Sequence, residues 1–111
     1  MDAIIERNDG ADAAELADRR RHERIGVMWM ATLRVPRGYF DCMIIDLSLG
    51  GARIAHGETL RLEIGDRVTL DLGSRGTFRA ETVWKRGGYA GVRFVDPSEI
   101  IAKAFGGLLP A

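Results

Sequence analysis

Two clusters of polar residues carry the side chains needed to bind a purine ligand that bears phosphate groups. The first is Arg19-Arg20-Arg21-His22-Glu23-Arg24, and the second is Asp46-Leu47-Ser48-Leu49-Gly50-Gly51. A guanidinium is a planar fork of donors that matches phosphate oxygens and the O6/N7 edge of guanine. The second cluster adds a carboxylate, a hydroxyl and glycines that allow close backbone approach. Together the two clusters predict an anion site for a guanine nucleotide.

The spacing within the clusters, Arg20-x-x-x-Arg24 and then Asp46-x-Ser48-x-x-Gly51, resembles the two signature motifs of the PilZ domain. That family is a bacterial receptor module for the second messenger cyclic di-GMP. Val83-Trp84-Lys85 and Gly91-Val92-Arg93-Phe94-Val95-Asp96 resemble its last two strands. The resemblance therefore covers roughly residues 19 to 96, and the order and separation of its loose motifs make the combination specific.

The resemblance implies that the first motif lies on a flexible linker that folds over the ligand, where Arg20 and Arg24 grip guanine edges and phosphates. Arg19, just before them, is compatible with an intercalated pair of messengers. Asp46 can accept hydrogen bonds from guanine N1–H and N2–H₂, and Ser48 can serve a phosphate or a base. The expected cyclic di-GMP contacts are Arg19, Arg20, Arg24, Asp46, Ser48 and Gly51, where Gly51 leaves room for the ligand.

Plainer interpretations exist for the same residues. The arginines could form a solvated basic stretch paired with the acidic residues before them, and such surface pairs contribute little. Asp46 to Gly50 could be an ordinary turn, because Asp and Ser hydrogen-bond their own backbone, and this interpretation is compatible with a binding role. For Trp84, packing in the core or at the barrel rim is favoured over stacking on a base.

The charge distribution divides the chain. The 16 basic and 16 acidic residues cancel overall. Residues 1–18 nevertheless carry six carboxylates against Arg7, a net charge of −5, and residues 19–37 carry six arginines against Glu23, a net charge of +5. An anionic ligand is drawn to the second segment. We expect an acidic flexible tail over 1–18, possibly part helical, and one domain over 19–111, consisting of linker and barrel (19–96) and a C-terminal helix (97–106).

Alternation of apolar and polar residues predicts short strands separated by glycine turns, with turns at Pro36-Arg37-Gly38 and at 46–50. The expected strands are 27–35, 39–45, 51–55, 67–72, 77–85 and 89–95. Such strands must curl to cover their apolar side, so the fold class is all-β, a small six-stranded antiparallel barrel. The resemblance implies the same fold.

After residue 95 the spacing of apolar residues changes from the alternation of a strand to that of a helix, which predicts a short C-terminal helix. Asp96 can be its N-cap, Pro97 suits the first position and Glu99 completes a capping box. The apolar face carries Ile100, Ile101, Ala104 and Phe105, and Gly106-Gly107 ends the helix. The face either plugs an open end of the barrel, which is favoured, or pairs with another subunit.

Catalysis has little support in the sequence. His22, His56 and the single Cys42 form no triad and no metal-ligand spacing, and a P-loop is missing. We therefore expect a receptor, not an enzyme, with no cofactor and no metal. The single cysteine, the lack of a secretory signal and the lack of a long apolar run predict a cytoplasmic protein without direct membrane insertion.

The leading hypothesis is a stand-alone cyclic di-GMP receptor in which the messenger orders residues 12–24 against the barrel mouth and signals to an unidentified downstream protein. The resemblance implies control of motility, of surface attachment in biofilms or of exopolysaccharide. One alternative is an adaptor that binds a protein partner without nucleotide. A nucleic-acid-binding barrel is disfavoured by zero net charge and few aromatic residues. A monomer or a weak homodimer is expected.

Overall fold

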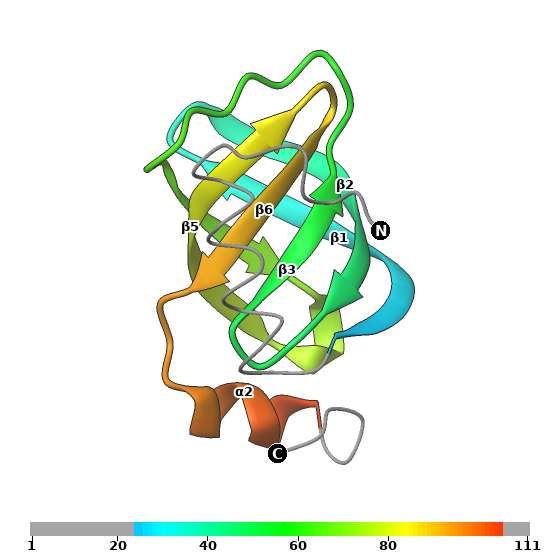
Figure 1. Cartoon of the computed structure of the whole chain (residues 1–111), viewed down its shortest axis with the longest axis vertical. Helices are drawn as coiled ribbons and strands as arrows, with labels where there is room; N and C mark the ends of the chain where they lie inside the picture. Colours follow the sequence, from blue (N-terminus) through cyan, green and yellow to red (C-terminus); the bar gives the residue numbers. More distant parts are fainter. Residues whose placement is uncertain (1–23, 106–111) are drawn as a thin grey trace, which may run out of the picture.

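Six strands form where the sequence alternates apolar and polar residues. The computed structural model describes residues 24–105, and these fold into an antiparallel barrel closed in the order β1-β2-β3-β6-β5-β4 (Figure 1). The strands are β1 (Ile25–Val35), β2 (Gly38–Leu47), β3 (Gly51–Ala55), β4 (Arg67–Asp71), β5 (Thr77–Arg86) and β6 (Tyr89–Phe94). The predicted fold class is confirmed.

The long first strand closes the barrel because it pairs on both of its edges. Leu33 lies opposite Phe40 of β2 on one side and opposite Leu70 of β4 on the other. Register shifts interrupt β1 between Gly26 and Trp29, β2 between Ile44 and Asp46, and β5 between Thr82 and Trp84. Bulges of this kind bend a strand and increase its twist, which a small closed sheet requires.

The inward-facing residues fill the barrel with aliphatic side chains. Along β1 the odd-numbered residues from Val27 to Val35 are buried or half-buried, whereas Met28, Met30 and Arg34 are exposed. This is the alternation expected for a strand with one face on the core. The centre of the core contains fully buried Leu33, Ile44, Leu47, Ile54 and Leu70.

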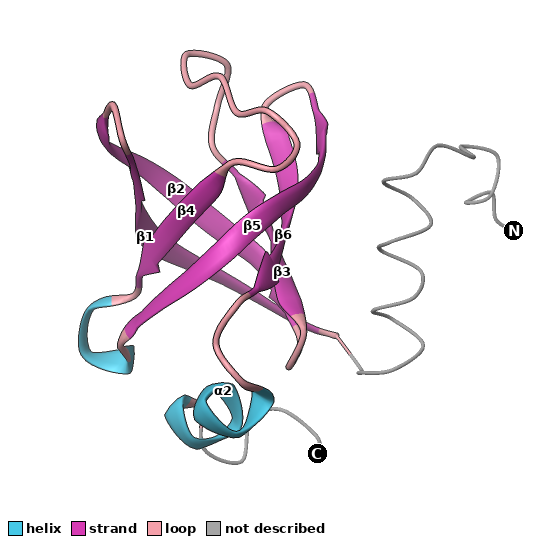
Figure 2. Cartoon of the chain, turned by 90° about the vertical axis from the view of Figure 1, so that its left-hand side faces the viewer, coloured by secondary structure: helices cyan, strands magenta, loops and turns pink. Residues whose placement is uncertain are grey.

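A short helix, α2 (Ser98–Ala104), covers one end of the barrel (Figures 1 and 2). Ile101 is fully buried, and the Phe105 ring that follows lies 6.0 Å from the ring of Trp29 and 5.3 Å from that of Phe78. Ile100 points away and is half exposed. The helix thus plugs the barrel, as favoured from the sequence, through Ile101 and Phe105.

The predicted capping box is wrong. The N-cap of α2 is Pro97, and no side chain caps the helix. The Asp96 carboxylate instead accepts hydrogen bonds from the backbone N–H of Arg79, at 3.0 Å, and from its guanidinium, at 2.8 Å. These two charge-assisted bonds to β5 occupy the group that a cap would need. The helix is also shorter than predicted, since Phe105 is its C-cap, and Gly106 and Gly107 lie outside the described residues.

The boundary of β2 also differs from the prediction. Asp46 and Leu47, which were expected in the turn, are the last two residues of the strand, and the turn shrinks to residues 48–50. Asp46 pairs with Arg53 and Leu47 pairs with Ala52 across β3. Cross-strand pairing and the burial of Leu47 extend the strand past a residue that favours turns in isolation.

Candidate functional site

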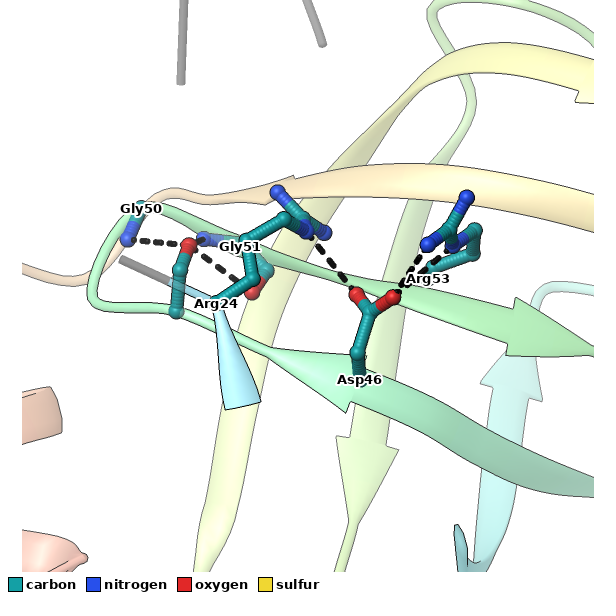
Figure 3. Close-up of polar contacts among 6 residues, drawn as sticks. Arg24, Asp46, Gly50, Gly51 and Arg53 are labelled. Atoms are coloured by element: carbon teal, nitrogen blue, oxygen red, sulfur yellow. Dashed lines mark hydrogen bonds and ion pairs between the residues drawn. The ribbon is translucent and has the colours of Figure 1, made fainter. Parts of the chain in front are cut away.

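The turn between β2 and β3 is built by a buried serine. Ser48 is fully buried, and its N–H donates to the carbonyl oxygen of Gly51 at 2.8 Å. Its Oγ accepts from the N–H groups of Gly50, at 3.1 Å, and Gly51, at 3.2 Å (Figure 3). The turn-forming role considered from the sequence is therefore confirmed, and these bonds direct the hydroxyl towards the turn backbone.

The carboxylate of Asp46 joins two arginines on the outer wall of the barrel. Its Oδ1 accepts a hydrogen bond from Nε of Arg24, at 2.9 Å, and its Oδ2 accepts from Nε of Arg53, also at 2.9 Å (Figure 3). The Nη2 of Arg53 donates to the same Oδ2. Arg24 lies just before β1, Asp46 ends β2 and Arg53 lies on β3, so three neighbouring segments converge on one carboxylate.

Low exposure distinguishes this cluster from the other ion pairs of the barrel. The side chains of Arg24 and Asp46 are 11% and 10% exposed, and that of Arg53 is 34% exposed. In the pair of Arg93 with Glu81 the corresponding values are 62% and 31%. Screening by water and salt weakens exposed pairs, so the interactions around Asp46 are stronger. Two guanidiniums around one carboxylate leave this surface with a positive charge that suits an anion.

Gly51 has a structural reason to be glycine. A Cβ at this position would lie 2.1 Å from the carbonyl oxygen of Val92 on β6. Gly51 pairs with Arg93 at this end of the β3–β6 ladder, so any side chain would push the two strands apart. The missing Cβ thus allows the close approach of β6, and the room for a ligand suggested from the sequence stays a prediction.

Trp84 lies on the same outer face as the arginine cluster. The register places Trp84 opposite Gly91, Gly91 opposite Arg53, and Arg53 opposite Asp46, in one row across four strands. The half-buried indole covers Gly91, where an added Cβ would lie 2.0 Å from Nε1 of Trp84. Trp84 therefore packs on the outer wall, whereas packing in the core or at the barrel rim was expected. Its ring lies over β6, the strand that pairs with the strand of Arg53.

The structure brings the two motifs together through Arg24 and Asp46, with Ser48 and Gly51 in the adjoining turn. Arg19 and Arg20 lie outside the described residues, as do the acidic segment 1–18 and His22. Arg53 was not among the expected site residues. The signal that could have identified it is its position two residues after Gly51, on the outward-facing side of a strand that starts at the motif.

The other chemically active side chains do not form a second centre within residues 24–105. No group of three or more His, Cys, Asp or Glu in this range is arranged to hold a metal ion. Burial, followed by the negative charge of Asp41, raises the pKa of the Cys42 thiol to about 11. None of the helices in the described range is long and apolar enough to cross a membrane.

Comparison with known proteins connects this geometry to one family. The family model described as the PilZ domain matches residues 18–109, which is most of the chain. A search of the curated proteins found no match. The matched range includes both clusters, all six strands and the helix.

Three solved structures share the fold. The PilZ domain of CeSA from a cellulose-synthesizing bacterium is 19% identical, with a TM-score of 0.61 over 76% of this chain and 96% of that chain. Escherichia coli YcgR in complex with c-di-GMP is 24% identical and has a TM-score of 0.55. The match covers 75% of this chain and 42% of YcgR. Borreliella burgdorferi PlzA in complex with c-di-GMP is 18% identical and has a TM-score of 0.59. The match covers 86% of this chain and 44% of PlzA. The chain thus spans less than half of the last two proteins.

Proposed function

This chain belongs to the PilZ domain family, and on that premise we propose that it is a receptor for cyclic di-GMP. The messenger binds on the outer wall of the barrel, where the segment that carries Arg24 meets the end of β2 and the turn after it. The chain acts by binding and not by catalysis, and it needs no cofactor.

The observation that carries this proposal is the contact between Arg24 and Asp46. These residues come from the two separate motifs, 22 positions apart, yet their side chains are joined by a hydrogen bond of 2.9 Å. A site assembled from both motifs needs them on one face of the barrel. Two of the similar structures, YcgR and PlzA, are complexes with c-di-GMP, which supports this choice of ligand.

Each group at the site has chemistry that suits the messenger. Guanidiniums of Arg19, Arg20 and Arg24 bind phosphate oxygens and the O6/N7 edge of guanine. The Asp46 carboxylate accepts from guanine N1–H and N2–H₂. Both of its oxygens already accept from arginines, so binding exchanges at least one of these bonds for a bond to the base.

Ser48 and Gly51 fix the backbone that positions the binding residues. The hydroxyl of Ser48 accepts two backbone N–H groups and fixes the turn. Gly51 lets β3 and β6 approach each other, which fixes the strand that carries Arg53. Arg53 holds the Asp46 carboxylate from the side opposite Arg24, and we assign it a positioning role in the site.

The signal passes through the segment that supplies the arginines. Residues 1–18 form the acidic tail and residues 19–111 form the receptor domain, with the linker at 19–24 between tail and barrel. Messenger binding orders residues 12–24 against the barrel and changes the surface offered to a downstream protein. The protein is cytoplasmic, and its output controls motility, surface attachment or exopolysaccharide.

Isothermal titration of the full chain with cyclic di-GMP, and with GMP and GTP as controls, tests the proposal. We expect a saturable heat signal with cyclic di-GMP and none with GMP or GTP. Arg20→Ala should lower the affinity for cyclic di-GMP. If the folded protein gives no heat with cyclic di-GMP, the receptor proposal fails and the nucleotide-independent adaptor replaces it. Tight, steeply salt-dependent filter binding of an oligonucleotide would instead favour a nucleic-acid ligand.

A further inference from the structure

A second basic surface lies at the end of the barrel opposite α2. A hollow of about 210 Å³ opens between the loop that follows β3 and the hairpin that joins β5 to β6. Both segments lie at the top of Figure 1, away from the helix. The hollow is lined by His56, Leu60, Arg61, Leu62, Lys85, Arg86, Gly87 and Tyr89.

The lining combines an apolar floor with a positively charged rim. Leu60 and Leu62 are buried, and the Tyr89 ring is half exposed. Arg61, Lys85 and Arg86 supply three cations, and none of the lining residues is a carboxylate. Such a surface fits a peptide that carries both acidic and aliphatic side chains.

Another hollow of the barrel has most of its charge compensated by carboxylates. That hollow, of about 310 Å³, also carries three cations, Arg34, Arg67 and Arg79. The guanidinium of Arg34 is 3.1 Å from Asp71, and that of Arg79 is 2.8 Å from Asp96, so carboxylates compensate two of these three cations. In the basic hollow Lys85 pairs with Glu63 at 2.9 Å, and within residues 24–105 Arg61, like Arg67, has no ion pair with a carboxylate.

We propose that this basic hollow binds the chain's own acidic N-terminal segment, residues 2–18. That segment carries six carboxylates against one arginine, a net charge of −5, and its larger aliphatic side chains are Ile4, Ile5 and Leu16. The carboxylates pair with the basic rim and the aliphatic side chains cover the apolar floor. This inference goes beyond messenger binding and does not depend on it.

The length of chain permits this contact. Arg24 is anchored at Asp46, which pairs with Arg53 of β3, and the hollow begins at His56, three residues after Arg53 and just past the end of β3. At the rise of a strand, this separation is about 10 Å. Asp18 precedes Arg24 by six residues, which reach about 20 Å when extended. The tether also gives the segment a high effective concentration, so several weak contacts suffice.

A nitroxide spin label on the full chain tests the inference. The label is attached to Ala11→Cys, in the middle of the segment, and broadens the NMR amide signals of residues close to it. Cys42 does not compete for the reagent near neutral pH, because it is 2% exposed and burial raises its thiol pKa to about 11. Without nucleotide, we expect strong broadening of the amide signals of Gly57, Lys85 and Gly87. The amide signal of Thr69 on β4 should broaden little.

Charge reversal in the hollow provides the decisive comparison. Arg61→Glu combined with Arg86→Glu should weaken the broadening at Gly57 and Gly87 about threefold or more, because attraction becomes repulsion. The matched control, Arg67→Glu with Lys103→Glu, changes the net charge equally away from the hollow and should leave the broadening unchanged. Unchanged amide shifts elsewhere verify the fold of each variant. Equal broadening in both variants, or strongest broadening away from the hollow, overturns the inference, whatever the result of the cyclic di-GMP titration.

Discussion

Arg24 and Arg53 donate hydrogen bonds to different oxygens of one carboxylate, that of Asp46, each at 2.9 Å. The two guanidiniums approach from opposite sides, because Arg24 precedes β1 and Arg53 lies on β3, the two strands that flank β2 in the barrel. Asp46 is therefore both the acceptor proposed for guanine and the residue that keeps two cations of the site in place. A change at Asp46 has consequences for the ligand and for the fold.

Asp46→Asn should lower the free energy of unfolding by about 2 kcal/mol, because it removes the charge of a buried carboxylate that accepts from two guanidiniums. Glu81→Gln is the matched control. It breaks a more exposed pair with Arg93 and should cost at most about 1 kcal/mol. Urea denaturation measures both values. An equal effect of the two substitutions would contradict the importance assigned to burial around Asp46.

Gly51→Ala should destabilise the barrel by about 3 kcal/mol, because the new Cβ collides with the Val92 carbonyl oxygen and neither backbone can move without breaking the β3–β6 pairing. Gly87→Ala is the comparison. Its φ of +58° is strained for alanine, yet no atom lies within 4 Å of the added Cβ, so the expected cost is about 1 kcal/mol. Thermal denaturation ranks the two variants. If Gly51→Ala is the milder, the close approach of β6 is not the reason for this glycine.

Substitutions of two adjacent isoleucines of α2 distinguish the two roles considered for this helix, plugging the barrel and contacting another subunit. Ile101 is fully buried, so Ile101→Ala should cost about 3 kcal/mol at any protein concentration. Ile100 is 51% exposed, and Ile100→Ala should cost less than about 0.5 kcal/mol. Urea unfolding at two protein concentrations measures both. Concentration-dependent stability together with a large effect of Ile100→Ala would support pairing between subunits instead.

The stability of the barrel should fall in acid partly through Asp96. The N–H of Arg79, and then its guanidinium, lower the pKa of this carboxyl below its ordinary value of 3.8. A lowered folded-state pKa adds stability that is present above the unfolded-state value and is lost as the pH falls through the folded-state value. Below about pH 4 the wild-type protein should therefore lose stability more steeply than Asp96→Asn. Parallel curves for the two proteins in acid would exclude this contribution. The pKa of Asp71 is lowered similarly, by the Gly73 N–H and by Arg34, and this effect remains in both proteins.

Much of the fold could be predicted because strand periodicity and glycine turns are local signals. β3 was predicted at its observed bounds, and strand β1 has the predicted alternation of buried and exposed residues. The capping box failed because Asp96 has a stronger partner in Arg79, 17 residues away, which no local pattern reveals. The end of β2 was misplaced for a similar reason, since cross-strand pairing overrides the turn preference of Asp46.

The residues of the site also fall into those that local sequence patterns identify and those that only the folded barrel reveals. The motifs identified Arg24 and Asp46 as members of one site because their side-chain chemistry and spacing are visible in the sequence, but the hydrogen bond between them was not predicted. The contribution of Arg53 depends on the register that places it opposite Asp46, and the constraint on Gly51 depends on the approach of β6. Both follow only after the barrel has closed. The contacts of Arg19, Arg20, Arg24, Asp46, Ser48 and Gly51 with cyclic di-GMP stay predictions.

The most direct test of the central claim is titration calorimetry with cyclic di-GMP on the wild-type chain, Arg24→Ala and Arg34→Ala. Both variants lose one arginine that pairs with an aspartate, but Arg34 lies near the far end of β1 and pairs with Asp71 of β4, away from Asp46. Arg24→Ala should weaken binding by about tenfold or more, through loss of a charge-assisted contact, and Arg34→Ala should bind like wild type. If folded Arg24→Ala binds as tightly as wild type, or if wild type does not bind at all, the messenger does not use this wall of the barrel.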